Sequence, residues 1–264
     1  MTFRIGFTLT GVALPPTTTD ARQALFAGLI DHAPTFPPAQ LPLAEGLAEH
    51  RRVREGDTGW LVNRFVCPAS KLTELGDETL RLSVVLDEGR LPNADGRIEA
   101  VEAAGIDPEV MVDAAEEVYC ELPLSYDVSF RILQLGELGL RAKVRCGGAT
   151  TPRVPDLAAF VSACRRLGVP FKATAGLHHA VRGQDEHGFL NLLAAAAFKG
   201  DEEEALAEED ESAFALTAEA FSWRERSVGP EEIARVRREL FVGFGSCSAQ
   251  EPIDGLRALG MLGG

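Results

Sequence analysis

Lysine is scarce in this chain. Arginine supplies 22 of the 26 basic residues, and the 264 positions contain only four lysines, Lys71, Lys143, Lys172 and Lys199. Arginine stays protonated in proteins, whereas a lysine removed from water can lose its proton. A lysine in such a background therefore indicates a position where a neutral amine is needed.

Other absences exclude whole classes of function. The five cysteines are odd in number and form no C-x-x-C pair, so we expect reduced thiols, a cytoplasmic location and no zinc site. No run reaches the ~18 apolar residues of a membrane span, and residues 1–16 lack a signal-peptide cleavage site. G-x-G-x-x-G and P-loop patterns are missing, and we expect no cofactor. A net charge of −14 argues against a nucleic-acid or anionic membrane surface.

Strand-like and helix-like segments alternate along the chain. Helical patterns follow several of the apolar runs, at 41–55, 107–117, 154–168 and 229–240, with Asp107 and Gly168 as expected caps. Such alternation predicts a parallel sheet, and eight units predict a closed (β/α)8 TIM barrel over residues 1–264, with an open doubly wound sheet as the alternative. The eight strand-length runs are 25–32, 60–66, 80–87, 97–103, 117–123, 140–146, 170–175 and 240–247.

One stretch departs from this rhythm. Residues 177–230 form a long insertion between the last two predicted strands, with an apolar segment at 187–198 and an acidic run at 201–211. We expect a core helix or an oligomer contact for the first and a solvated face for the second.

Period-two alternation predicts which side chains point into the barrel. In "RAKVR", Lys143 shares a face with its two neighbouring arginines, and Lys172 shares a face with Thr174. Active sites of such barrels lie where the strands end. The charged and polar residues predicted at this rim are Asp31, Asn63, Glu99, Glu121, Lys143, Arg145 and Lys172.

Two inward lysines on neighbouring strands have a chemical consequence. Like charges at close range disfavour double protonation, and burial acts in the same direction, so we expect one amine to be neutral near neutral pH. A neutral amine attacks a carbonyl group and forms a Schiff base, which then accepts electrons when a carbon–carbon bond is broken or made.

Short motifs in the same order resemble the deoxyribose-phosphate aldolase family of class I aldolase barrels. They are "LIDHAPTFPPA", "VNRFVCPASKL", "IEAVE", "AKVRCGG", "FKATAGL" and "FGSCS" followed by "LRALG". Glu99 stands where that family has aspartate, and Ala175 stands in place of the first of two glycines. "KATAGLHH", "HGFLN" and "FGSCS" are also similar to a widespread bacterial family, a likeness that implies no activity.

The resemblance to the aldolases implies a role for each matching residue. Lys143 would form the Schiff base, Lys172 would lower its pKa, and Asp31 and Glu99 would relay protons. The residues near a phosphate or other anion would be Gly176, Gly245, Ser246 and Ser248.

Two further readings remain open at the level of sequence. His178, His179 and Glu121 could hold a divalent metal for hydrolysis or isomerisation on the same barrel, although substrate contact is the stronger expectation for both histidines. Alternatively, the basic strand residues bind an anionic metabolite without turnover. In each case the expected partner is a small anionic or carbonyl compound, and the oligomeric state stays open.

Overall fold

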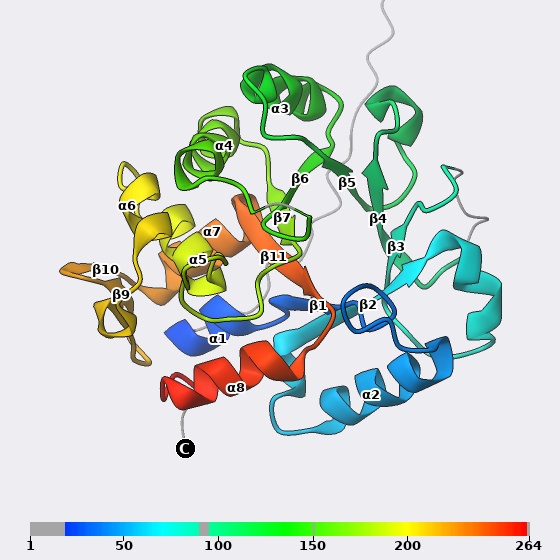
Figure 1. The fold of residues 1–264 in the computed structure, drawn as a ribbon, viewed down its shortest axis with the longest axis horizontal. Helices are drawn as coiled ribbons and strands as arrows, with labels where there is room; N and C mark the ends of the chain where they lie inside the picture. The colour runs from blue at the N-terminus through cyan, green and yellow to red at the C-terminus, as the bar shows by residue number, and fades with distance from the viewer. Residues whose placement is uncertain (1–18, 90–94, 150, 263–264) are drawn as a thin grey trace, which may run out of the picture.

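Eight parallel strands close into a barrel in a computed structural model, which describes residues 19–89, 95–149 and 151–262. The hydrogen-bonded order around the barrel is β1-β11-β7-β6-β5-β4-β3-β2 (Figure 1). The strands are β1 Ile30–His32, β2 Val62–Pro68, β3 Leu82–Val85, β4 Ile98–Ala104, β5 Glu117–Glu121, β6 Arg141–Arg145, β7 Phe171–Thr174 and β11 Phe241–Ser246. The predicted (β/α)8 barrel is confirmed, and each barrel strand lies within or overlaps one predicted run.

The first unit resolves an ambiguity of the sequence. The run 25–32 is divided between the end of helix α1 and strand β1, with Gly28 between them at a φ of 57°. A positive φ suits glycine because it has no Cβ. Residues 1–16, in which we expect no signal peptide, lie outside the described residues.

Helices cover the outside of the barrel unevenly (Figure 1). The predicted helix at 107–117 is wrong: only the short 3-10 helix η3 forms there, although Asp107 caps it by accepting from the Glu109 amide. None of the described helices is long and apolar enough to cross a membrane. The α-helices are α1 Ala21–Phe26, α2 Leu43–Glu55, α3 Val128–Glu137, α4 Val154–Leu167, α5 Phe189–Ala197, α6 Glu202–Ala207, α7 Pro230–Glu239 and α8 Gln250–Ala258, and the 3-10 helices are η1 Gly59–Leu61, η2 Ala69–Leu75, η3 Pro108–Met111 and η4 Glu211–Ala213.

Local sequence explains the ends of the best-defined outer helix. Helix α4 begins with Pro155 in its first turn and carries basic residues in its last turn. It ends at Gly168, which adopts the left-handed conformation at a φ of 67° and donates back to helix carbonyls, as predicted. The apolar face of α4, including Phe160, packs against Phe171 of the barrel.

Between β7 and α7 the chain forms the helices α5 and α6, the 3-10 helix η4 and a small sheet. Helix α5 is almost entirely buried, and Phe189 stacks on Phe244 of the last barrel strand, so the apolar run is a core helix. The acidic run contains α6 and is largely exposed. An antiparallel sheet follows, with strands β8 Phe214–Leu216, β9 Phe221–Trp223 and β10 Arg226–Val228.

Candidate active site

Charged side chains occupy the middle of the barrel, where aliphatic residues are usual. A buried charge requires partners that replace its lost hydration. The arrangement of this group therefore decides what the barrel interior can do. The polar and charged residues buried in the barrel interior are Asp31, Arg64, Ser83, Glu102, Lys143 and Lys172, each less than one-tenth exposed.

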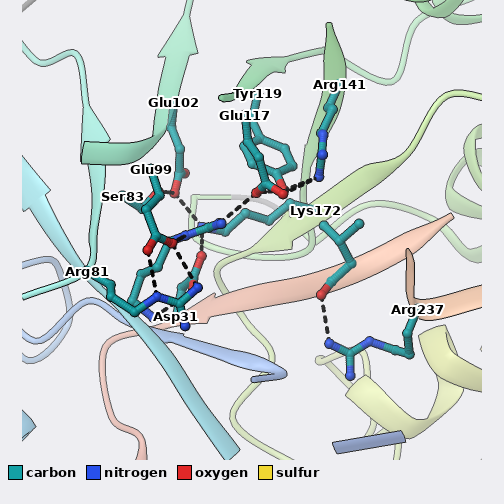
Figure 2. Close-up of polar contacts among 12 residues, drawn as sticks. Asp31, Arg81, Ser83, Glu99, Glu102, Glu117, Tyr119, Arg141, Lys172 and Arg237 are labelled. Atoms are coloured by element: carbon teal, nitrogen blue, oxygen red, sulfur yellow. Dashed lines mark hydrogen bonds and ion pairs between the residues drawn. The ribbon is translucent and has the colours of Figure 1, made fainter. Parts of the chain in front are cut away.

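The two scarce lysines lie side by side. Strands β6 and β7 are in parallel register with Lys143 opposite Lys172, and both side chains enter the interior as the alternation predicts. Lys172 Nζ lies 2.5 Å from Asp31 Oδ2 and 2.5 Å from Glu102 Oε1 (Figure 2). Lys143 Nζ lies 3.1 Å from Glu102 Oε2 and 3.1 Å from Glu121 Oε2. One carboxylate therefore bridges the two amines.

This bridge changes the electrostatics expected from the sequence. Burial alone would raise the pKa of Glu102, but Lys172 and Lys143, with the hydroxyl of Ser83 donating at 2.7 Å, hold it well below its usual range. Burial would likewise lower the pKa of Lys172, yet Asp31 and Glu102 raise it above the usual lysine value. Lys172 is therefore held in its protonated form, and simple repulsion between two ammonium groups does not describe the site.

A second layer of charges lies nearer the N-terminal ends of the strands. Arg64 pairs with Glu117 at 2.7 Å and with Glu99 at 3.0 Å, and Arg141 pairs with Glu117 at 2.7 Å. The Tyr119 hydroxyl donates to Glu117, and the Lys172 ammonium lies 5.7 Å from the centre of its ring. Figure 2 shows this layer beside Lys172. A cavity of about 220 Å³ opens here at the N-terminal end of the barrel.

Glu99 is not the acid beside the lysines. The register between β3 and β4 moves from Leu82 opposite Ile98 to Ser83 opposite Ala100, so Glu99 is the extra residue of a bulge. Its carboxylate pairs with Arg64 and Arg81 in the N-terminal layer. Glu102 takes the predicted place instead. The sequence signal for Glu102 is that it follows Glu99 by three residues in an otherwise apolar strand.

Asn63 is displaced for the same reason. Strand β2 places the four residues 62–65 opposite the three residues 30–32 of β1, since Ile30 faces Val62 and His32 faces Phe65. The Arg64 side chain is then buried in the barrel, and its amide donates to Asp31 Oδ1 at 3.1 Å. Asn63 lines the N-terminal cavity and not the pocket at the C-terminal strand ends, where the alternation predicted it.

A larger pocket of about 580 Å³ opens at the C-terminal end of the strands, where barrel enzymes hold their substrates. Its polar lining includes Glu102, Glu121, Lys143, Arg145 and Thr174. Lys143 is therefore the lysine that a ligand in this pocket meets, whereas Lys172 lines the smaller cavity beneath it. The apolar part of the wall comes from Ala33, Phe36, Pro37, Pro38, Val66, Val85, Ala104 and Leu177.

Glycines bring two loops together at the rim of this pocket. A Cβ on Gly147 would lie 2.7 Å from the Cα of Gly176, and one on Gly176 would lie 2.8 Å from the Cα of Gly147. Gly176 lines the pocket, but this packing accounts for it without an anion. Its neighbour Ala175 has a φ of 62°, which is unusual for a residue with a side chain and costs free energy.

The last strand and its following helix complete the rim. Gly245 and Ser246 line the pocket, and the Ser246 hydroxyl donates to the Ser248 carbonyl at 2.6 Å. Ser248 Oγ accepts from the Glu251 amide in the first turn of α8 at 3.3 Å. Cys247 is buried, and burial raises the pKa of its thiol, which argues against a nucleophilic role.

The two adjacent histidines have separate partners. His178 lines the pocket with Nδ1 2.7 Å from Glu251 Oε2, whereas His179 is largely exposed with Nε2 3.5 Å from Glu186. Glu121 pairs with Lys143 instead. Within residues 19–89, 95–149 and 151–262, no group of three or more His, Cys, Asp or Glu side chains is arranged to hold a metal ion. The metal hypothesis therefore has no ligand set in this part of the chain.

Comparison of the chain with protein-family models finds no matching family, and comparison with curated proteins finds no match either. The likeness to deoxyribose-phosphate aldolases accordingly remains a resemblance of short motifs.

Proposed function

We propose that the protein is a Schiff-base aldolase-type lyase that acts on a small polar carbonyl compound. The observation that carries the proposal is Lys143, an amine on the floor of the large pocket with two carboxylates 3.1 Å away. The protonated Lys172 lies on the far side of the bridging Glu102. An amine, proton acceptors and a fixed cation in one enclosed site are the groups that such chemistry uses.

The first step requires a neutral amine. Glu121, which lines the pocket 3.1 Å from Lys143 Nζ, is placed to accept a proton from it. The freed electron pair of Nζ then bonds to the substrate carbonyl carbon, while Glu121 passes the proton on to the carbonyl oxygen and becomes a carboxylate again. Loss of that oxygen as water leaves a protonated imine on Lys143. Lys172 stays ionised throughout, and it keeps Glu102 anionic beside the developing positive charge.

Bond cleavage follows from the same groups. A carboxylate removes the proton of the hydroxyl group on the third carbon, counting the imine carbon as the first. The bond between the second and third carbons breaks, an aldehyde leaves, and the electron pair passes into the imine to give an enamine. Protonation of the enamine carbon and addition of water release the second carbonyl product and restore Lys143. Glu121 lines the pocket and lies nearest to solvent of the acids in contact with the amines, which suits it to the hydroxyl proton.

We also propose that the protein is located in the cytoplasm. All five cysteines are buried free thiols, which supports a reducing compartment such as the cytoplasm.

Borohydride trapping tests the covalent step. Wild-type protein incubated with a panel of small aldehydes and ketones should gain the mass of one reduced adduct, and peptide mapping should place it on Lys143. The exposed Lys199 supplies the matched control. Lys199→Met should trap as the wild type does, and Lys143→Met should not. A folded wild-type protein that traps none of the panel would count against the proposal.

A further inference from the structure

Arg145 is an unneutralised cation at the pocket. It lines the pocket from the end of β6, and no hydrogen bond or ion pair engages its guanidinium among the residues that the structure describes. The other arginines facing the barrel differ in this respect, since Arg64 and Arg141 both pair with Glu117. Arg145 is therefore available to a negatively charged ligand.

The Thr174 hydroxyl is a second polar group without a partner among the described residues, and it lies in the same layer of the barrel as Arg145. Its hydroxyl oxygen is buried without a hydrogen-bond partner in the described structure, and its side chain lines the pocket. Strand pairing sets Thr174 directly opposite Arg145, one layer above the pair formed by Lys143 and Lys172. A buried hydroxyl without a partner costs free energy, which a ligand oxygen would relieve.

The spacing of the two layers selects a chemical class. Two residues along a parallel strand advance about 6.6 Å, and Lys143 and Arg145 leave the same face of β6. The distance from an imine nitrogen to an oxygen of a carboxylate on the adjacent carbon is roughly 3 Å. A charge-assisted hydrogen bond adds about 2.8 Å. A carboxylate next to the reacting carbonyl therefore spans the distance from Lys143 to the Arg145 layer.

We propose that the substrate is a 2-oxo acid whose carboxylate is held by Arg145 and Thr174 while its carbonyl carbon meets Lys143. This inference rests on the proposed Schiff-base function and names its substrate class. The apolar wall near Phe36 and Val66 takes the rest of the molecule. Charge supports the assignment, because the carboxylates beside the lysines would repel an anion placed any deeper in the barrel.

Pyruvate and acetone are the probes, since they share a methyl ketone and differ only in the carboxylate. Borohydride trapping is measured against the concentration of each compound in the wild type, Arg145→Met and Thr174→Val. The exposed Arg166, changed to Met, is the control. Loss of one charged contact should raise the pyruvate concentration for half-maximal trapping about tenfold to a hundredfold in Arg145→Met and by a smaller factor in Thr174→Val. Arg166→Met should match the wild type, and trapping of acetone should be the same in all four proteins.

Two results separate this inference from the proposed function. If pyruvate and acetone are both trapped on Lys143 but Arg145→Met leaves the pyruvate dependence unchanged, the lyase proposal stands and the carboxylate site is wrong. Calorimetric titration of pyruvate without borohydride covers the other case. Arg145-dependent binding without any trapping would support the carboxylate site while contradicting Schiff-base chemistry. Absence of both binding and trapping would overturn the two together.

Discussion

Replacement of Glu102 by glutamine tests the charged interior most directly. The side chain is 2% exposed and accepts from Lys172 at 2.5 Å, Lys143 at 3.1 Å and Ser83 at 2.7 Å. Glutamine keeps the shape but removes the negative charge, and its NH2 group must face a lysine that is also a donor. Breaking a buried ion pair from one side costs about 3–5 kcal/mol. For a chain of this length, that predicts a fall in Tm of roughly 6–12 °C.

The measurement is thermal unfolding followed by circular dichroism near neutral pH. Glu137, an exposed acid on α3, provides the matched control, and Glu137→Gln should stay within about 0.5 kcal/mol of the wild type. A double-mutant cycle with Lys172→Met isolates the pair. Lys172→Met alone leaves Asp31 and Glu102 without their shared cation, so the double variant should cost about 1–3 kcal/mol less than the sum of the single changes.

The dependence on pH has a defined sign. The folded-state pKa of Glu102 lies well below its usual value of 4.5, so its contribution to stability is complete above about pH 4.5 and is lost as the pH falls further. Glu102→Gln should therefore flatten the acid side of the stability curve. A glutamine variant that melts within about 2 °C of the wild type, with additive changes in the cycle, would refute the view that these charges are desolvated partners.

Two other positions give independent predictions. The stacked His32 and His50 have pKa values lowered to about 3 and about 4, mainly by burial, so the unfolded chain takes up protons first and stability should fall from pH 6.5 toward pH 4. The slope should be at most about 1.4 kcal/mol per pH unit for each histidine. His32→Leu should reduce this slope in urea unfolding at pH 7, 6 and 5, and equal slopes would contradict the reasoning. Ala175→Gly should stabilise the protein by about 0.5–1 kcal/mol by relieving the positive φ, and a lower melting temperature would show that the loop is held by other means.

Strand positions were predictable because hydrophobic runs of the right length recur along the chain. The inward direction of the Lys143 and Lys172 side chains was predictable for a related reason. The pairing of β6 with β7 contains no bulge, so simple alternation holds along both strands. Glu121 and Arg145 line the pocket at the strand ends, where the rule for barrel sites predicted them, whereas Asp31, predicted at the same rim, lines the cavity beneath it together with Lys172. At these positions the alternation read from the sequence matches the side-chain directions in the barrel.

The acid between the lysines was not predictable by the same rule. An extra residue at Glu99 reverses the alternation in β4, and nothing in "IEAVEAA" marks where that bulge falls. A bulge in β2 likewise buries the Arg64 side chain in the barrel interior, where alternation predicted Asn63. Bulges depend on how a strand fits its neighbours, which a single sequence does not record.

The bridging network also bears on how the chain reaches its folded state. Lys172 lies 141 positions from Asp31 and 70 positions from Glu102, and Lys143 lies 41 positions from Glu102. None of these pairs can form until distant strands have met and the barrel is nearly closed. Their attraction therefore does little to speed folding, and its main effect is to slow unfolding once the barrel has closed.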